Sequence, residues 1–95
     1  VEEGHILSNE PGYYEEEKFG IRHEALVHVT AAHEGYFKFE TLTCFPFDRK
    51  LIDKAYLSSE HIVWLNAYHH SVYDKLAPHL ETDVRQWLAD RCAPL

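Results

Sequence analysis

The sequence is short of sulfur-containing residues, because its 95 residues include no methionine and only two cysteines. Cys44 and Cys92 lack the close spacing of a zinc knuckle, so nothing indicates a thiolate metal site. We expect two reduced thiols, as in a cytoplasmic protein, although one disulfide is compatible with the sequence. A chain that begins at Val1 without methionine is expected to be a segment of a longer protein.

Membrane and secretion signals are also missing. No apolar run is long enough to span a bilayer, and the acidic start of the chain is unlike a signal peptide. Basic residues are few, since 9 Lys and Arg stand against 16 Asp and Glu and give a formal net charge of −7. This balance argues against a nucleic-acid partner, which needs a basic face, and suits a cation site. The hydrophobic content of 45% is typical of a globular chain.

Two glutamates, Glu10 and Glu24, lie between segments with strand character. Residues 5–8 form a short apolar run, and residues 19–29 are rich in β-branched and aromatic side chains. Pro11 and Gly12 together favour a turn. Two antiparallel strands meeting here would bring the two carboxylates together.

Carboxylates held close together repel each other, and a divalent cation between them removes that cost. Hard divalent ions prefer oxygen ligands, so Glu10 and Glu24 are candidate metal ligands. Arg22 precedes Glu24 by two residues and shares its face in a strand. Arg22 is therefore a candidate to hold the Glu24 carboxylate in place without itself binding the metal.

The clearest strand covers residues 36–46, and another covers residues 25–30. Glu40 on the first is either a carboxylate turned toward a site or a structural acid paired with a nearby base, and we favour the pair. His28 on the second is expected to be a packed or partly exposed side chain rather than a ligand. A turn is predicted over residues 31–35.

Two helices are predicted after the strands. The first begins near Ser58 or Ser59, either of which can cap it, and ends before Pro78. Its apolar stripe repeats at three and four residues and consists of Ile62, Leu65, His69, Val72 and Leu76. The second begins at about residue 82, with an apolar face of Val84, Trp87, Leu88 and Cys92. Neighbours on a helix point about 100° apart, so we expect His69 to be packed and His70 exposed rather than a chelating pair.

Five motifs occur in order along the chain: NEPGYY, KFGIRHE, FKFETLT, FDRKLID and WLNAYH. In this ordered set the sequence resembles the Xaa-Pro aminopeptidases (aminopeptidase P), metallopeptidases of the pita-bread fold, over residues 5–95. The resemblance is greatest to the longer, eukaryote-type branch. It implies an α+β fold that forms the C-terminal part of the pita-bread catalytic domain. We expect three or four mostly antiparallel strands over residues 5–46 and a helical tail over residues 58–93.

The resemblance also implies a function. The family holds two manganese ions with two aspartates, one histidine and two glutamates, and the glutamates of its EPGxY and GIRxE motifs are Glu10 and Glu24 here. Arg22 would orient the ligands, and Tyr14 would line the site. The other ligands lie upstream in the family, so this segment alone is expected to have no peptidase activity and no stably bound metal. It would act with the rest of its catalytic domain, in a homo-oligomer, on peptides with proline in second position.

Some positions depart from the family pattern. His23 and Ala25 stand where isoleucine and asparagine usually flank the second glutamate, and Glu17 stands where glycine is common. Two alternatives remain open: a non-catalytic binding module of the pita-bread fold, and a segment used for dimerisation. The presence of both Glu10 and Glu24 favours the enzyme.

Overall fold

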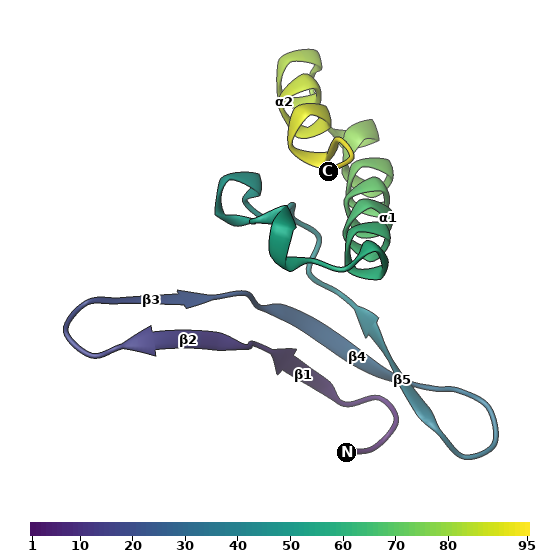
Figure 1. Ribbon diagram of the computed structural model, residues 1–95. Coiled ribbons are helices and arrows are strands. Elements are labelled where there is room, and N and C mark those ends of the chain that lie inside the picture. The colour runs from purple at the N-terminus through teal and green to yellow at the C-terminus, as the bar shows by residue number, and fades with distance from the viewer. The chain divides into compact units, whose positions relative to one another are not determined.

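The computed structural model describes residues 1–95, and its contacts divide them into two compact units, Val1–Thr43 and Cys44–Leu95. The first unit contains only strands and loops (Figure 1). The second contains two α-helices and three short 3-10 helices. The predicted α+β class, with antiparallel strands followed by two helices, is confirmed. Neither helix is long and apolar enough to cross a membrane.

The first unit is built from five antiparallel strands. Their bounds are β1 Ile6–Asn9, β2 Gly12–Glu15, β3 Phe19–Arg22, β4 Ala25–Ala31 and β5 Phe37–Thr41. β1, β4 and β5 form a three-stranded sheet with β4 in the centre, while β2 and β3 form a two-stranded ribbon. The count exceeds the three or four predicted, because Gly12–Glu15 forms a strand that was not expected.

One face of the three-stranded sheet carries the core of the first unit. Val27 and Val29 of β4 are buried, at 6% and 0% exposure. On β5, Phe39 pairs with Val29 and therefore shares its face, yet it is 62% exposed. Phe37 on the same face is 50% exposed. The valines alone leave much of this face uncovered, as expected of a sheet that packs against further protein.

The predicted turn at Pro11 and Gly12 is wrong. Gly12 belongs to β2, and the Pro11 carbonyl accepts a hydrogen bond from the His23 amide at 3.1 Å, so the ribbon passes through this point without reversing. Proline has no amide hydrogen to donate, which accounts for the break between β1 and β2. The chain instead reverses after Glu15, where Glu17 adopts a left-handed φ of 59°.

The strand predicted over residues 36–46 ends at Thr41. The Leu42 amide still bonds to the Leu26 carbonyl at 2.8 Å, but the Leu26 amide then donates to the hydroxyl of Thr43 at 2.8 Å. A side-chain oxygen thus takes the place of the next backbone carbonyl, and the ladder stops there. The prediction missed this end because the alternation of side chains continues beyond it.

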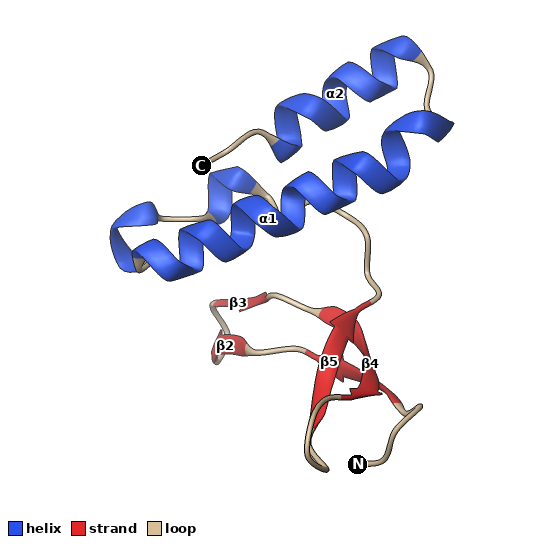
Figure 2. Cartoon of the chain, turned by 90° about the vertical axis from the view of Figure 1, so that its right-hand side faces the viewer, coloured by secondary structure: helices blue, strands red, loops and turns tan.

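The two helices are α1 Ser59–Leu76 and α2 Thr82–Cys92, and they pack side by side (Figure 2). Ser58 caps α1 as predicted: its hydroxyl accepts from the His61 amide at 3.2 Å, and its own amide donates to His61 Nδ1 at 3.4 Å. This reciprocal pair satisfies two amides that the first turn leaves open. α1 ends before Pro78, which lies in the 3-10 helix Ala77–His79.

The core of the second unit lies between α1 and α2. It consists of Val72, Leu88 and Cys92, with Cys44, Tyr68, Tyr73, Leu76 and Leu80 packed against it. Val84 and Trp87 were predicted on the buried face of α2, but they are 45% and 44% exposed. The apolar stripe of α2 is therefore wider than the strip that α1 covers.

Candidate metal site on the β-ribbon

Glu10 and Glu24 lie opposite each other on the ribbon of the first unit. Asn9 pairs with Ala25 at the end of β1, and Gly12 pairs with Arg22 at the start of β2. The same register continues across the intervening residues, as the bond from His23 to Pro11 shows. Residues directly opposite in an antiparallel pair project from the same face. The register thus brings the two predicted ligands together.

Arg22 contacts Glu24 as predicted. Its Nε lies 2.7 Å from Glu24 Oε2, and the two side chains are 50% and 53% exposed. An ion pair this open to water adds little stability, but it fixes the direction of the carboxylate. One oxygen of Glu24 is held by the guanidinium, and the other stays available to a ligand.

Tyr14 lies flat across the same face of the ribbon. A Cβ atom on Gly12 would lie 2.5 Å from the Tyr14 hydroxyl oxygen, and one on Gly20 would lie 2.7 Å from Tyr14 Cδ1. Any side chain at either glycine would therefore push the ring away. The Tyr14 ring therefore packs directly on the backbone of the two glycines, and its hydroxyl reaches Arg22.

The Tyr14 hydroxyl completes a chain of contacts that runs through Arg22 to Glu24. The hydrogen bond from the Arg22 guanidinium to Tyr14, and then the charge of Glu24, raise the pKa of Arg22 above its ordinary value. Arginine is always protonated in proteins, so the guanidinium offers a positive charge to Glu24. Its position is set from both sides, by a phenol and by a carboxylate.

The chemistry of this site fits part of a metal centre. Glu10 and Glu24 offer carboxylate oxygens, which hard divalent ions prefer. No group of three or more His, Cys, Asp or Glu side chains that could hold an ion occurs within residues 1–95. These two glutamates can therefore contribute to a centre but cannot complete the coordination of even one ion without ligands from elsewhere.

Glu40 and His28 pair with each other on the three-stranded sheet. They are directly opposite in the register of β4 and β5, and His28 Nδ1 lies 3.7 Å from Glu40 Oε2. This agrees with the interpretation of Glu40 as an acid paired with a nearby base. His28 lies beside the carboxylate of Glu40 rather than that of Glu10 or Glu24.

His69 is completely buried in the second unit, as predicted, whereas His70 is exposed and contacts Asp74 at 3.1 Å. Nε2 of His69 accepts a hydrogen bond from the Phe47 amide at 3.1 Å, so the proton of the neutral ring is on Nδ1. That Nδ1 has no hydrogen-bond partner. Burial, followed by the charge of Arg49, lowers the pKa of His69.

The family of the chain follows from its match to known proteins. Residues 35–95 match the family model described as the C-terminal region of peptidase M24, which covers well over half of the chain. The chain therefore belongs to this family.

Individual relatives are aminopeptidases. Aminopeptidase P2 of Arabidopsis thaliana is 44% identical over 100% of this chain, and a probable Xaa-Pro aminopeptidase P of Laccaria bicolor is 40% identical over 97% of it. The crystal structure of X-prolyl aminopeptidase from Caenorhabditis elegans, described as a cytosolic enzyme with a di-nuclear active site, matches 100% of the chain with a TM-score of 0.89 and 35% identity. The chain spans 14%, 16% and 17% of the length of these three proteins. The resemblance to Xaa-Pro aminopeptidases is thereby confirmed.

Two positioning residues of the site, Gly12 and Gly20, were not identified from the sequence. The signal was present, because a glycine stands two residues before Tyr14 and another stands directly across the ribbon from it. An aromatic ring that covers a cross-strand glycine is a known device of β-sheets. To recognise this arrangement from the sequence, the pairing of β2 with β3 must be known. The predicted turn at Pro11 gave the wrong pairing.

Proposed function

We propose that Glu10 and Glu24 are carboxylate ligands in the dinuclear centre of an Xaa-Pro aminopeptidase, of which this chain forms one part. The observation that carries the proposal is the ribbon register, which sets the two carboxylates opposite each other with Arg22 2.7 Å from one of them. The names of the relatives support the reaction: removal of the N-terminal residue from peptides with proline in second position. Further ligands come from outside these residues.

Each residue of the ribbon has a distinct task in this scheme. Glu10 and Glu24 hold the ions from one side, and Arg22 keeps Glu24 oriented while it neutralises part of the local negative charge. Tyr14 fixes the guanidinium from behind. Two divalent ions held there would supply a nucleophile from water and polarise the carbonyl of the scissile bond. Manganese suits an oxygen-rich donor set of this kind.

The residues 1–95 alone are proposed to be inactive and to hold no metal stably. Two carboxylates cannot fill the coordination shells of two ions, so these residues alone would bind metal weakly. That weak binding would also have to supply the free energy that orders the exposed ribbon. The exposed Phe37 and Phe39, on the sheet face that also carries the buried Val29, support a role for this unit as part of a larger domain.

The test is made in the complete polypeptide, with Glu10→Gln and Glu24→Gln studied separately. Metal content is measured by mass spectrometry, and cleavage is measured on an Xaa-Pro peptide. We expect each variant to lose bound metal together with activity, by more than the ~10–100-fold that loss of a supporting contact costs. Glu16→Gln, an exposed acid in the adjacent turn, is the matched control and should retain both.

A variant that keeps both ions and near-normal turnover would remove its glutamate from the ligand set. If the unaltered complete polypeptide binds no metal and cleaves no Xaa-Pro peptide, the alternative of a non-catalytic binding module takes the place of the enzyme.

We also propose that the complete protein is cytosolic and homo-oligomeric. The cytosolic description of the C. elegans relative supports the first point. For the second, Val63 and Trp64 are neighbouring apolar side chains of α1 that are 68% and 55% exposed, and a subunit contact would cover them. Sedimentation equilibrium of the complete polypeptide measures the assembly directly, and a monomer at all concentrations would contradict the proposal.

A further inference from the structure

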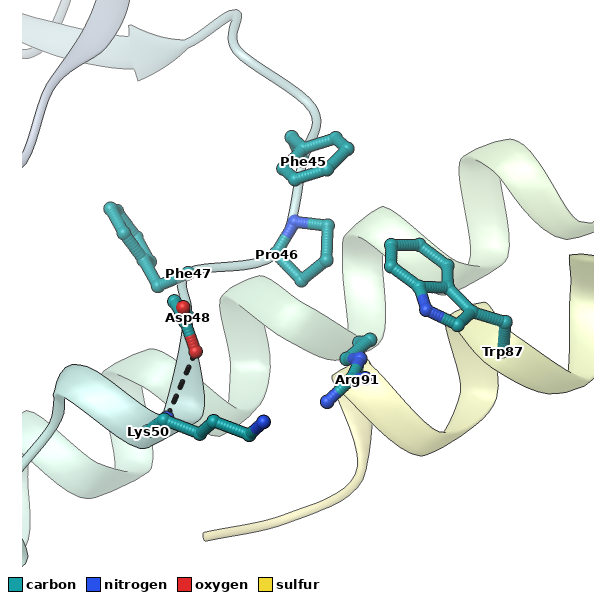
Figure 3. Close-up of a pocket in the computed structure, with 7 residues that line it drawn as sticks. All are labelled: Phe45, Pro46, Phe47, Asp48, Lys50, Trp87 and Arg91. Atoms are coloured by element: carbon teal, nitrogen blue, oxygen red, sulfur yellow. Dashed lines mark hydrogen bonds between the residues drawn. The ribbon is translucent and has the colours of Figure 1, made fainter.

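A pocket of about 260 Å³ opens in the second unit, between the segment 45–50 and α2 (Figure 3). Phe45 and Pro46 line it from the segment, and Trp87 lines it from the helix. Lys50 and Arg91 contribute the cationic part of the lining. The pocket is therefore mostly aromatic and apolar, with two positive charges. None of its residues takes part in the site on the ribbon.

The segment that forms one wall is held firmly. The Phe45 amide donates to the hydroxyl of Tyr68 at 3.4 Å, and the same hydroxyl donates to the Phe45 carbonyl at 3.1 Å. Two residues later, the Phe47 amide is bound to the buried His69. A wall fixed in this way loses little freedom when a ligand binds, which favours affinity.

The opposite wall is a single face of α2. Trp87 and Arg91 are four residues apart and so lie above one another on the helix. The Arg91 guanidinium carbon lies 5.6 Å from the centre of the Trp87 ring, a cation–π contact that restrains the arginine without occupying its donors. The Phe45 ring approaches Trp87 from the other wall, with the ring centres 6.3 Å apart. Phe45 and Trp87 are 62% and 44% exposed.

The charges of the lining suit an anion. Neither Lys50 nor Arg91 forms an ion pair, although acidic residues outnumber basic ones in the chain and give it a net charge of −7. Both side chains extend into the space between the two walls (Figure 3). Asp48 is the one acid in the lining, and its Oδ1 accepts from the backbone amide of Lys50 at 3.0 Å. The lining thus carries a net charge of +1, enough for one carboxylate.

We propose that this pocket binds the carboxyl-terminal residue of a partner protein that ends in a bulky apolar side chain. The terminal carboxylate would accept from Arg91 and Lys50, because guanidinium and ammonium groups match a carboxylate in charge and donors. The last side chain would pack against Pro46 and the exposed faces of the Phe45 and Trp87 rings, which contact each other. The volume is below the ~300–1,000 Å³ of a pocket for a drug-sized molecule, so it holds about one residue. The inference does not depend on the proposed peptidase activity.

The experiment uses the complete polypeptide and fluorescence anisotropy. The probe is a short peptide that carries a dye on its amino terminus, has no proline in second position, and ends in leucine with a free carboxylate. A twin peptide has the same sequence and an amidated end. We expect the free acid to bind about ten-fold more tightly than the amide, because the amide loses the charge-assisted contacts.

The variants Arg91→Gln and Lys50→Gln should each weaken binding of the free acid several-fold and reduce its preference over the amide. Lys50 is exposed, and Arg91 is half-buried with its guanidinium over the Trp87 ring, so we expect both variants to fold. Lys75→Gln removes the same charge from an exposed position of α1 outside the pocket and is the matched control, with no effect expected. Trp87→Ala should weaken both peptides, because it removes the apolar contact that they share.

Several results would overturn the inference. Equal binding of the acid and the amide would do so, as would tight binding of an amidated peptide with an internal glutamate, which would identify an acidic side chain as the ligand. A change in oligomeric mass on Trp87→Ala would assign the pocket to a subunit contact. Protection of Trp87 fluorescence from acrylamide in the complete polypeptide would show that the same protein already covers it.

Discussion

Replacing His69 with glutamine should make the second unit less sensitive to mild acid while leaving it folded. His69 is fully buried, and its Nε2 accepts the Phe47 amide at 3.1 Å. That bond requires the neutral ring, because a protonated histidine has no acceptor. Glutamine can place its side-chain oxygen close to the position of Nε2, so it keeps the acceptor and has no proton to gain.

The direction of the pH dependence follows from the lowered pKa of His69, which burial and then the charge of Arg49 produce. In the unfolded chain a histidine takes up a proton at about pH 6.5. In the folded state it does so only at lower pH. The stabilisation is therefore fully present above about pH 6.5 and is lost as the pH falls from there through the folded-state pKa.

The free energy that the hydrogen bond between His69 and the Phe47 amide contributes is obtained by comparing two variants. His69→Leu removes the acceptor that His69 offers to the part-buried Phe47 amide, which should cost about 1–3 kcal/mol more than His69→Gln. Amide hydrogen exchange at Phe47, expressed as protection relative to an unstructured peptide, measures the local free energy of opening. Measurements at about pH 5 and about pH 7.5 bracket the transition of a free histidine. The wild type should lose protection at the lower pH, and His69→Gln should lose much less.

His70→Gln is the matched control, because His70 is the exposed neighbour on the same helix. It should leave the protection of Phe47 and its pH dependence unchanged. The reasoning fails if His69→Gln shows the same loss of protection in acid as the wild type. It also fails if His69→Leu and His69→Gln are equally protected at neutral pH.

Two further predictions concern the ribbon. Glu17→Gly should stabilise the first unit by about 0.5–1 kcal/mol in urea unfolding, because Glu17 has a left-handed φ of 59° that glycine adopts without strain, whereas Glu16→Gly should destabilise it. No gain from the first change would show that the turn carries no strain. Gly20→Ala should lower the activity of the complete enzyme by roughly 10–100-fold with its circular dichroism unchanged, because the new methyl group would displace Tyr14 from Arg22. Normal turnover would show that the ring is not required there.

The helical half was predictable because its signals are local. Ser58 caps the first helix through residues three positions away, and the stripe that includes His69 and Val72 is read from a fixed period. The contact between Arg22 and Glu24 was also predictable, since residues two apart share one face of an extended chain. In each case the partner is close in sequence.

The errors occurred where a distant residue decides the local structure. Pro11 and Gly12 have the composition of a turn, but the His23 amide binds the Pro11 carbonyl and keeps the chain extended. The strand that includes Thr41 stops because the Thr43 hydroxyl captures the Leu26 amide. Neither contact can be inferred from the amino acids that neighbour it in the sequence. Secondary-structure propensity alone therefore could not predict either contact.

The opposed position of Glu10 and Glu24 makes the number of residues in the hairpin as important as their identity. One residue inserted into or deleted from the loop between β2 and β3 would shift the pairing by one place. Glu10 would then face a neighbour of Glu24, and the Glu24 side chain would leave from the other side of the ribbon. A change of two would restore the face but separate the carboxylates along the strands. The loop can therefore tolerate many substitutions, including glutamate at position 17, while its length is tied to the chemistry at the far end of the ribbon.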